Sequence, residues 1–285
     1  AAKALSQGQF GQFPLYAFCE DGIWAVQIDA EGRISAKQPI TRDVIIHQDA
    51  LCQLDGSVAF LTKEGVKIIS GSQTECISIP LHGYNLDDTQ YKPLLPEDYQ
   101  SLAPMDDKPF FTQLGESTRL VYDAPHQLLH LFTQQLNEQG LHYVNLLGTN
   151  EWVMQKLNDS VKAVVPGYPL STLQMGKRIF TYDHLNDADT LRKGYFLTRS
   201  TFLGNAWSRK ALYDLRVMGQ RLLPDSSWQV IVLISNDGMH WTRLTSLKAG
   251  SCRYYRFLVY SNLCDADTIS GITLQYEERY TGKLR

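Results

Sequence analysis

Long apolar runs are missing from this sequence of 285 residues. No stretch approaches the roughly 20 consecutive apolar residues that a membrane-spanning helix needs, so we expect no membrane partner. The composition, with 44% hydrophobic and 20% charged residues, is that of an ordinary globular protein. Residues 1–13 lack both an initiator Met and the apolar core of a signal peptide. We therefore expect the chain to be part of a longer or processed product.

Paired cysteines are also missing. The five cysteines are an odd number at scattered spacings, without the CxxC pairs of zinc sites and redox motifs. The pattern predicts reduced core thiols at Cys19, Cys52, Cys76, Cys252 and Cys264.

Signatures for cofactors and nucleic acids are absent as well. No Gly-rich phosphate loop follows a strand and opens a helix, and no aromatic RNA-binding signature occurs. We expect no cofactor and no sequence-specific nucleic-acid partner.

His126 and His130 are spaced like the two ligands of a helical zinc motif, but Gln127 stands where that motif has Glu. The surrounding residues read as a strand, in which positions four apart lie about 13 Å from each other. We therefore expect no metal site here.

Clustered carboxylates occur in two short stretches, and neither has the spacing of a calcium loop, so solvated turns are the better interpretation. A hydrolase that draws two carboxylates from distant strands remains an open alternative. The residues concerned are Asp183, Asp187 and Asp189 in the first stretch and Asp265 and Asp267 in the second.

Ser235, Asp237 and His240 lie within six residues and are of the types that serine hydrolases use. A catalytic triad needs its members on separate elements, with His between the other two. Asp237-Gly238 between two apolar strands instead predicts a hairpin loop of three or four residues, with Trp241 anchoring the returning strand. No catalytic, cofactor-binding or metal residue is predicted, and we expect a protein that is not an enzyme.

Short strands of period 2 follow one another from residue 15, with turns at acid-Gly pairs such as Asp21-Gly22 and Glu64-Gly65. Similar runs recur over 118–132, 140–147 and 150–157, with a weaker copy at 177–185. Repeated small antiparallel sheets are typical of β-propeller blades.

The expected fold is therefore all-β. Residues 1–191 form a propeller-like meander domain, too short to close a ring by itself, with an irregular insertion near 84–112. Longer strands then predict a C-terminal β-sandwich over 192–285, with the apolar stretch 228–235 as its central strand. One face of its last strand is expected to be buried, since apolar and polar residues alternate there. Ile272, Leu274 and Tyr276 fall on that face, and Thr273, Gln275 and Glu277 fall on the other.

Charge divides at the same boundary. Residues 1–191 hold 13 Lys/Arg and 23 Asp/Glu, whereas residues 192–285 hold 14 and 7. The basic part is expected to face an acidic neighbour, although scattered surface charge explains the division about as well. The 15 tyrosines suit either interfaces or half-buried sheet positions.

Residues 9–46, residues 54–72 and the C-terminal stretches 230–244 and 271–285 resemble structural proteins of phages and prophages of gut bacteria. The similarity is to the propeller-containing stabilisation or tail accessory proteins of short-tailed phages, which sit below the portal and help to retain packaged DNA. The resemblance rests on turn and strand signatures and implies no catalytic residue. It implies a virion protein, made in the bacterial cytoplasm, whose partners are portal and tail proteins or copies of itself.

A second hypothesis stays open. The stretch 235–241 is also similar to an element of discoidin-like sandwiches, which bind glycans. A carbohydrate-binding or cell-surface protein that uses Trp241 and nearby aromatic residues is the alternative function.

Overall fold

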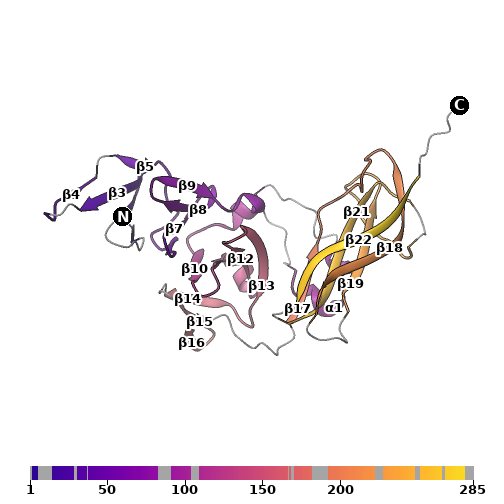
Figure 1. The fold of residues 1–285 in the computed structure, drawn as a ribbon. Coiled ribbons are helices and arrows are strands. Elements are labelled where there is room, and N and C mark those ends of the chain that lie inside the picture. The colour runs from indigo at the N-terminus through magenta and orange to yellow at the C-terminus, as the bar shows by residue number, and fades with distance from the viewer. Residues whose placement is uncertain are drawn as a thin grey trace. The chain divides into compact units, whose positions relative to one another are not determined.

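A computed structural model describes most of the chain, and Figure 1 shows its ribbon. The described residues are 2–5, 15–28, 31–36, 38–82, 91–103, 109–165, 167, 170–181, 192–221, 227–247, 251–264 and 267–279. Two compact units divide the chain: unit 1 comprises residues 1–85 and 106–186, and unit 2 comprises residues 86–105 and 187–285. Nearly all regular structure is antiparallel sheet, which confirms the all-β class.

Unit 1 contains four sheets. The first runs in the order β1-β2-β3-β4, with β5 also pairing with β3, and the second and third have the sequential orders β6-β7-β8-β9 and β10-β11-β12-β13. The fourth has the order β14-β15-β16. The strands of the first two sheets are β1 (Ala2–Leu5), β2 (Leu15–Cys19), β3 (Gly22–Ile28), β4 (Ile34–Ser35), β5 (Pro39–Thr41), β6 (Leu51–Gln53), β7 (Val58–Thr62), β8 (Gly65–Ser70) and β9 (Gln73–Cys76). Those of the other two are β10 (Arg119–Asp123), β11 (Leu128–Phe132), β12 (Leu141–Leu146), β13 (Glu151–Lys156), β14 (Val161–Val165), β15 (Thr172–Met175) and β16 (Arg178–Thr181).

Consecutive sheets of unit 1 share apolar clusters. Alternate residues of β7 enter different clusters: Val58 and Phe60 pack with side chains of β2 and β3, whereas Ala59 and Leu61 pack with side chains of β10 and β11. On β10, Val121 faces a further cluster with side chains of β14 and β15. Successive strand residues point to opposite faces of a sheet, so β7 and β10 are apolar on both faces. The sheets that contain them, β6–β9 and β10–β13, therefore pack against a neighbouring sheet on each face.

The acid-Gly hairpins form where the sequence predicts them. Cys19 pairs with Gly22, and Thr62 pairs with Gly65, so each turn has two residues and the Gly begins the returning strand. Gly22 and Gly65 have φ values of 136° and 128°, which other residues rarely adopt.

Unit 2 contains two sheets, of order β17-β21-β19-β20 and β18-β22. Val232, Tyr255 and Phe257 of the first sheet and Leu212 of the second belong to one apolar cluster, with Ile272 and Leu274 packed against it. The expected burial of one face of the last strand is thus observed for Ile272 and Leu274, whereas Tyr276, expected on the same face, is 40% exposed. The strands are β17 (Arg192–Leu197), β18 (Arg209–Gln220), β19 (Gln229–Ser235), β20 (Thr242–Arg243), β21 (Tyr254–Leu263) and β22 (Thr268–Arg279).

β19 pairs with both β20 and β21, as its apolar sequence predicts for a central strand. The sequence predicts five strands in this part of the chain, over 211–219, 228–235, 240–247, 253–263 and 269–280. Two features of the sheet differ from this prediction. β17 is an additional strand, and β20 covers only two residues of the predicted stretch 240–247, where Arg243 is exposed and no apolar alternation supports a longer ladder.

The second face of the β17-β21-β19-β20 sheet is covered by part of the segment that the sequence analysis places as an insertion in the first domain. Leu95, Tyr99 and Ala103 pack against Ile231, Leu233 and Leu258, and Asp98 pairs with Lys193 at 2.7 Å. The apolar residues of this segment do not alternate as in a strand, and they are buried against this face of the sheet.

This assignment changes the charge division. Unit 1 as defined by contacts carries 12 Lys/Arg and 17 Asp/Glu, and unit 2 carries 15 and 13. Residues 86–105 include four Asp/Glu and one Lys, and one of these acidic residues, Asp98, pairs with Lys193 of β17.

The helices are short: the α-helices α1 (Glu97–Gln100) and α2 (Gln134–Glu138), and the 3-10 helices η2 (Ile79–Leu81), η4 (Lys92–Leu94) and η5 (Phe110–Gln113). Pro96 is the N-cap residue of α1. Of the helices in the described ranges, none has the length and apolar character needed to cross a membrane.

Candidate functional site

Trp207 is the most exposed large apolar side chain in the described part of the chain, with 82% of its surface accessible. It lies in the loop that connects Thr198 to β18 in unit 2. A Trp side chain has a large apolar area and dominates the energetics of many interfaces when a partner covers it. An indole held in solvent is therefore a candidate contact point.

The backbone of this loop has a defined and costly conformation. Leu203 and Gly204 both have positive φ, at 49° and 90°, and a left-handed Leu persists only where its surroundings impose it. The Asn205 side chain accepts the Trp207 N–H at 2.9 Å, and the Ser208 hydroxyl donates to the Asn205 carbonyl at 3.2 Å.

Lys210 holds the loop from inside. Its side chain is fully buried, and its Nζ donates to the carbonyl of Asn205 and, at 2.9 Å, to that of Ser208. Burial lowers the pKa of Lys210. An ammonium that satisfies two carbonyl groups of one loop fixes that loop before any partner arrives, which reduces the entropy cost of binding.

The base of the loop is fixed to the other sheet of unit 2. Lys210 and Cys252 exchange backbone hydrogen bonds at 2.8 and 3.1 Å. The Tyr255 hydroxyl accepts the Cys252 N–H at 3.2 Å and donates to the Lys210 carbonyl, and burial raises the pKa of this hydroxyl. Trp207 is thus displayed on a rigid support.

Charges of both signs lie next to this loop, since Glu277 and Glu278 precede Arg279 on β22. Arg209 is directly opposite Arg279 on the β18-β22 ladder, and like charges in this position destabilise a sheet. The Arg279 Nε lies 3.9 Å from Glu277, whereas Arg209 forms no ion pair within the described ranges.

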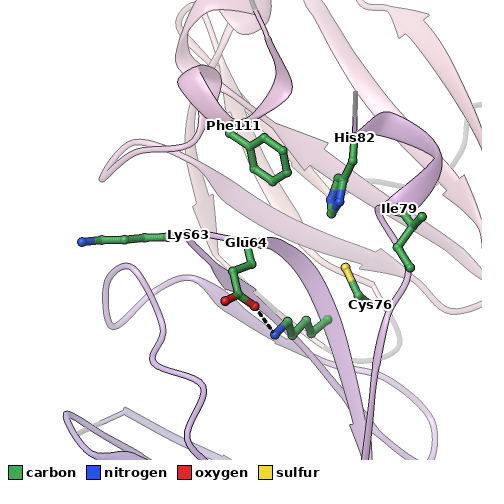
Figure 2. A pocket seen from close by; sticks show the side chains of 7 residues that line it. Lys63, Glu64, Cys76, Ile79, His82 and Phe111 are labelled. Carbon is green, nitrogen blue, oxygen red and sulfur yellow. Dashed lines mark hydrogen bonds and ion pairs between the residues drawn. The ribbon is translucent and has the colours of Figure 1, made fainter. Parts of the chain in front are cut away.

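A pocket of 540 Å³ in unit 1 is the second feature (Figure 2). The turn between β7 and β8, the end of β9 and η2 contribute to it, and Phe111 of η5 lies at its upper edge in this view. Its walls combine exposed apolar side chains with cationic and anionic groups. The lining residues are Lys63, Glu64, Lys67, Cys76, Ile79, His82 and Phe111.

His82 forms a wall of this pocket and is held on both sides. Its Nε2 lies 2.7 Å from Ser78 Oγ, which also accepts the Val66 N–H at 3.0 Å. Its ring contacts Phe110 and Phe111 with centroid distances of 5.8 and 4.5 Å. Burial lowers the pKa of His82, so the neutral ring is favoured and the wall is largely apolar at neutral pH.

Lys67 and Glu64 form the polar side of the pocket. Lys67 Nζ bonds Asp43 at 2.6 Å and Glu64 at 2.7 Å, and Figure 2 shows the second of these two bonds as a dashed line. Burial disfavours the charge on Lys67, but the two carboxylates outweigh this effect and raise its pKa.

Ser235, Asp237 and His240 are brought into contact, but in the wrong order for a triad. Asp237 lies in the middle: Ser235 Oγ donates to its Oδ1 at 2.8 Å, and His240 Nδ1 is 2.7 Å from its Oδ2. Asp237 Oδ1 also accepts the N–H groups of Met239 and His240. These bonds depress the pKa of Asp237, and the bonds from His240 have the largest effect. The loop between β19 and β20 spans 236–241 and is longer than the three or four residues expected.

Trp241 packs against the apolar cluster beneath residues 91–103, with the Arg256 guanidinium 5.4 Å from its ring centre. It therefore anchors the returning chain.

His126 and His130 do not share a strand as expected. His126 lies in the turn before β11, with its Nδ1 2.9 Å from Asp123, because the hairpin closes there. His130 is buried, and its Nδ1 lies 3.1 Å from Nε2 of buried His142. One of these two nitrogen atoms must donate the hydrogen bond and the other must accept it, so they cannot both carry a proton. Within the described ranges, no three His, Cys, Asp or Glu residues are grouped to hold a metal ion.

Asp183, Asp187, Asp189 and Asp265 lie outside the described residues. Asp267 has a local structural role: its Oδ2 accepts the Cys264 N–H at 3.1 Å and lies 3.6 Å from Arg221 Nε.

All five cysteines are free thiols. Cys52, Cys252 and Cys264 are buried as expected, whereas Cys19 and Cys76 are half-buried. Burial raises the pKa of Cys52 to about 12.

The sequence analysis predicts no role for Trp207 or Lys210. A Trp within "LGNAWSRK", a stretch of turn-forming residues without strand alternation, could have indicated an aromatic residue displayed on a loop. The pocket could not be predicted in this way, because its lining residues come from separate elements. Comparison of the chain with protein-family models and with curated proteins finds no match.

Proposed function

We propose that this protein is a non-enzymatic structural component of a phage or prophage virion that works through protein–protein contacts. Its place would be near the portal or tail, where such proteins help to retain packaged DNA. Portal and tail proteins or copies of the chain would be its partners, and the virion, after synthesis in the bacterial cytoplasm, its location.

The observation that carries this proposal is the preorganised display of Trp207. A buried lysine and a left-handed leucine fix the loop that carries Trp207, whose side chain is 82% exposed. Trp, together with Arg, is enriched among the residues that dominate protein interfaces. A loop that serves only as a connection gains nothing from this arrangement.

The sheets fit the same proposed function, because they can serve as a rigid scaffold for such contacts. In this proposal β6–β9 and β10–β13 are neighbouring propeller-type blades, since each is a sequential four-stranded meander and they share an apolar cluster. Unit 2 is a β-sandwich with one additional covering segment, since its two sheets enclose a common cluster.

The test is co-purification of the full chain with the products of the genes that flank its own, alongside light scattering of the isolated protein over a concentration series. We expect a stable complex with a portal or tail protein, or self-association. A chain that stays monomeric and captures none of these products contradicts the proposal.

A carbohydrate-binding function is the second candidate. The observation in its favour is the same exposed indole, because sugars stack on rigid aromatic faces. Trp241, the aromatic residue first considered for this role, is instead packed against Arg256 and the apolar cluster. A glycan array probed with the protein and with Trp207→Ala separates the functions: binding that this substitution abolishes favours the glycan-binding function.

A further inference from the structure

We propose that the buried pair of His130 and His142 is an acid-sensitive device within unit 1. Protonation of the pair releases the sheet β14–β16 from the sheet β10–β13 at mildly acidic pH. This response goes beyond the proposed function and does not depend on it.

The two imidazoles lie next to each other inside the sheet β10–β13. His130 of β11 and His142 of β12 are both fully buried, and Nδ1 of His130 lies 3.1 Å from Nε2 of His142. The Phe132 ring is stacked on the His142 ring with a centroid distance of 4.5 Å. One hydrogen atom occupies the space between the two facing nitrogens, so the bond between them is complete when both rings are neutral.

The pair lies on the face of the sheet that β14–β16 covers. Val121 is directly opposite His130 on the β10–β11 ladder, and Phe132 is two residues from His130 on the same strand, so these side chains point to one face. Val121 and Phe132 form an apolar cluster with Val161 of β14 and Leu173 of β15. The sheet β14–β16 therefore helps to shield the imidazoles from water.

β10 brings two charged residues to this face, one at each end of the strand. Asp123 is buried, and its Oδ2 lies 2.9 Å from Nδ1 of His126. Arg119, at the other end, bonds backbone carbonyl groups. Asp123 stands one step along the ladder from the residue opposite His130, and it is engaged with His126, whose own protonation at low pH strengthens that contact.

The other elements around the pair bring uncharged side chains to it in the part of the chain that the structure describes. Gln155 of β13 is directly opposite His142. Glu138 of α2 and Lys162 of β14 are exposed to solvent. The side chains of β14 and β15 that pack in the shared cluster are all apolar. They are Val161, Val164, Leu173 and Met175.

Protonation of either ring places a positive charge in this interior. An ionised group that is removed from water is costly, and stacking on the Phe132 face offsets only part of that cost. Protonation of both rings places a hydrogen atom on each of the facing nitrogens and breaks the bond between them. In water an imidazole has a pKa of about 6.5 and takes up a proton freely below it. The closed state is therefore favoured above about pH 6.5, and the state in which the rings are exposed gains as the pH falls below it.

The sheet β14–β16 is small enough to open on its own. Besides the apolar cluster, Asn137 of α2 holds it, because its side chain donates to the Val161 carbonyl at 2.6 Å and accepts the Val161 N–H at 2.7 Å. Other apolar side chains of the sheet are turned to solvent, with Val165 64% and Ile179 73% exposed. An element with few buried contacts opens at a lower free energy than the core of a protein.

Hydrogen exchange of the full chain at pH 7 and pH 5, corrected for the intrinsic effect of pH on exchange, measures the release. Each imidazole that is neutral in the closed state and free in the open state raises the open population by about 25-fold between these two pH values. We expect the amides of β14 and β15 to lose protection by at least this factor. The amides of β21 in unit 2 should keep their protection.

The double variant His130→Asn/His142→Gln separates the pair from other effects of acid. Side-chain amides can bond to each other in place of the facing nitrogens, but they do not titrate in this range. We expect this variant to protect β14 and β15 equally at pH 7 and pH 5. His82→Gln removes another partly buried imidazole of unit 1, and as the matched control it should respond to acid like the native chain. Circular dichroism at pH 7 establishes that each variant is folded.

NMR titration of the histidine rings in the native chain provides a second measurement, which decides alone if the double variant does not fold. The rings of His130 and His142 should stay neutral until the amides of β14 and β15 lose protection. The acid-sensitive device is excluded if the two rings take up protons while these amides remain protected. It is also excluded if the native chain keeps its protection at pH 5, or if the double variant loses protection as the native chain does.

Discussion

Lys210 shows how a single buried charge can shape a surface. Its ammonium lies in a site where it is fully covered, yet it bonds two loop carbonyls instead of a carboxylate. An isolated buried charge is costly, and strong hydrogen bonds offset part of that cost. The residue is therefore better explained by the loop that it organises than by a gain in overall stability.

We expect Lys210→Met to leave the two carbonyls without their donor and to lower the free energy of unfolding by about 1–3 kcal/mol. Urea denaturation measures this loss, and hydrogen exchange should show faster opening of residues 203–208. Lys162→Met, at an exposed position of β14, is the matched control and should change stability by at most about 0.5 kcal/mol. Equal effects of the two substitutions would argue against the assigned role.

Asp237 stabilises its turn through hydrogen bonds that its ionised form accepts. Asp237→Ala removes these acceptors and should lower the melting temperature, whereas Asp237→Asn retains an amide oxygen in the same place and should lower it less.

The pKa of Asp237 is depressed in the folded chain. Its contribution is therefore present above the unfolded-state pKa of about 3.9 and is lost as the pH falls below it. The difference in melting temperature between the native chain and Asp237→Ala should shrink from pH 6 to pH 3. A difference that stays constant over this range would contradict the mechanism.

At the scale of elements, the inner strands of unit 1 carry apolar side chains on both faces, and each face packs against a different cluster. β7 is buried along its whole length because its alternate residues enter two clusters. The turns that connect such strands need a residue that tolerates positive φ and close contact. Gly65 meets both conditions: a Cβ built on it would lie 2.2 Å from Ser78 Oγ and 2.7 Å from His82 Nε2.

Gly65→Ala should therefore cost about 1–3 kcal/mol of stability, because it combines a strained backbone with displacement of the Ser78–His82 pair. It should also change the environment of the His82 ring, which NMR detects. Gly56→Ala is the control, since a Cβ there meets no atom within 4 Å, and it should be close to neutral. Loss of stability in both variants would point to a general effect of the substitution.

At the scale of the whole chain, residues 86–105 make unit 2 discontinuous in sequence. Leu95 and Tyr99 cover a sheet face that would otherwise present Ile231, Leu233 and Leu258 to solvent. The boundary near residue 192 that composition suggests is therefore not sufficient to define a unit that folds.

We expect the fragment 192–285 alone to aggregate or to bind hydrophobic dyes, because one face of its main sheet is uncovered. A chain that joins residues 86–105 to 187–285 by a flexible linker should fold cooperatively, which circular dichroism and thermal melting measure. A well-folded, monomeric fragment 192–285 would show that the segment is dispensable.

Local sequence was a good guide to the elements of this protein. Alternation of apolar residues and Asp-Gly or Glu-Gly pairs act within a few residues, so β2, β3, β7 and β8 and their turns could be predicted. The central position of β19 followed from its apolar character on both faces. The catalytic interpretation of residues 235–241 could be rejected for the same reason, since the three side chains belong to one turn.

The sequence by itself thus determined the all-β class, the hairpins and the apolar strands, because these depend on neighbours along the chain. Tertiary structure alone decided that residues 91–103 cover the sheet of unit 2, that Lys210 is buried beneath an exposed Trp207, and that Ile79 and Phe111 share a pocket. The physical reason is that a side chain's burial and its partners depend on residues distant in sequence, and no local pattern specifies which of them meet.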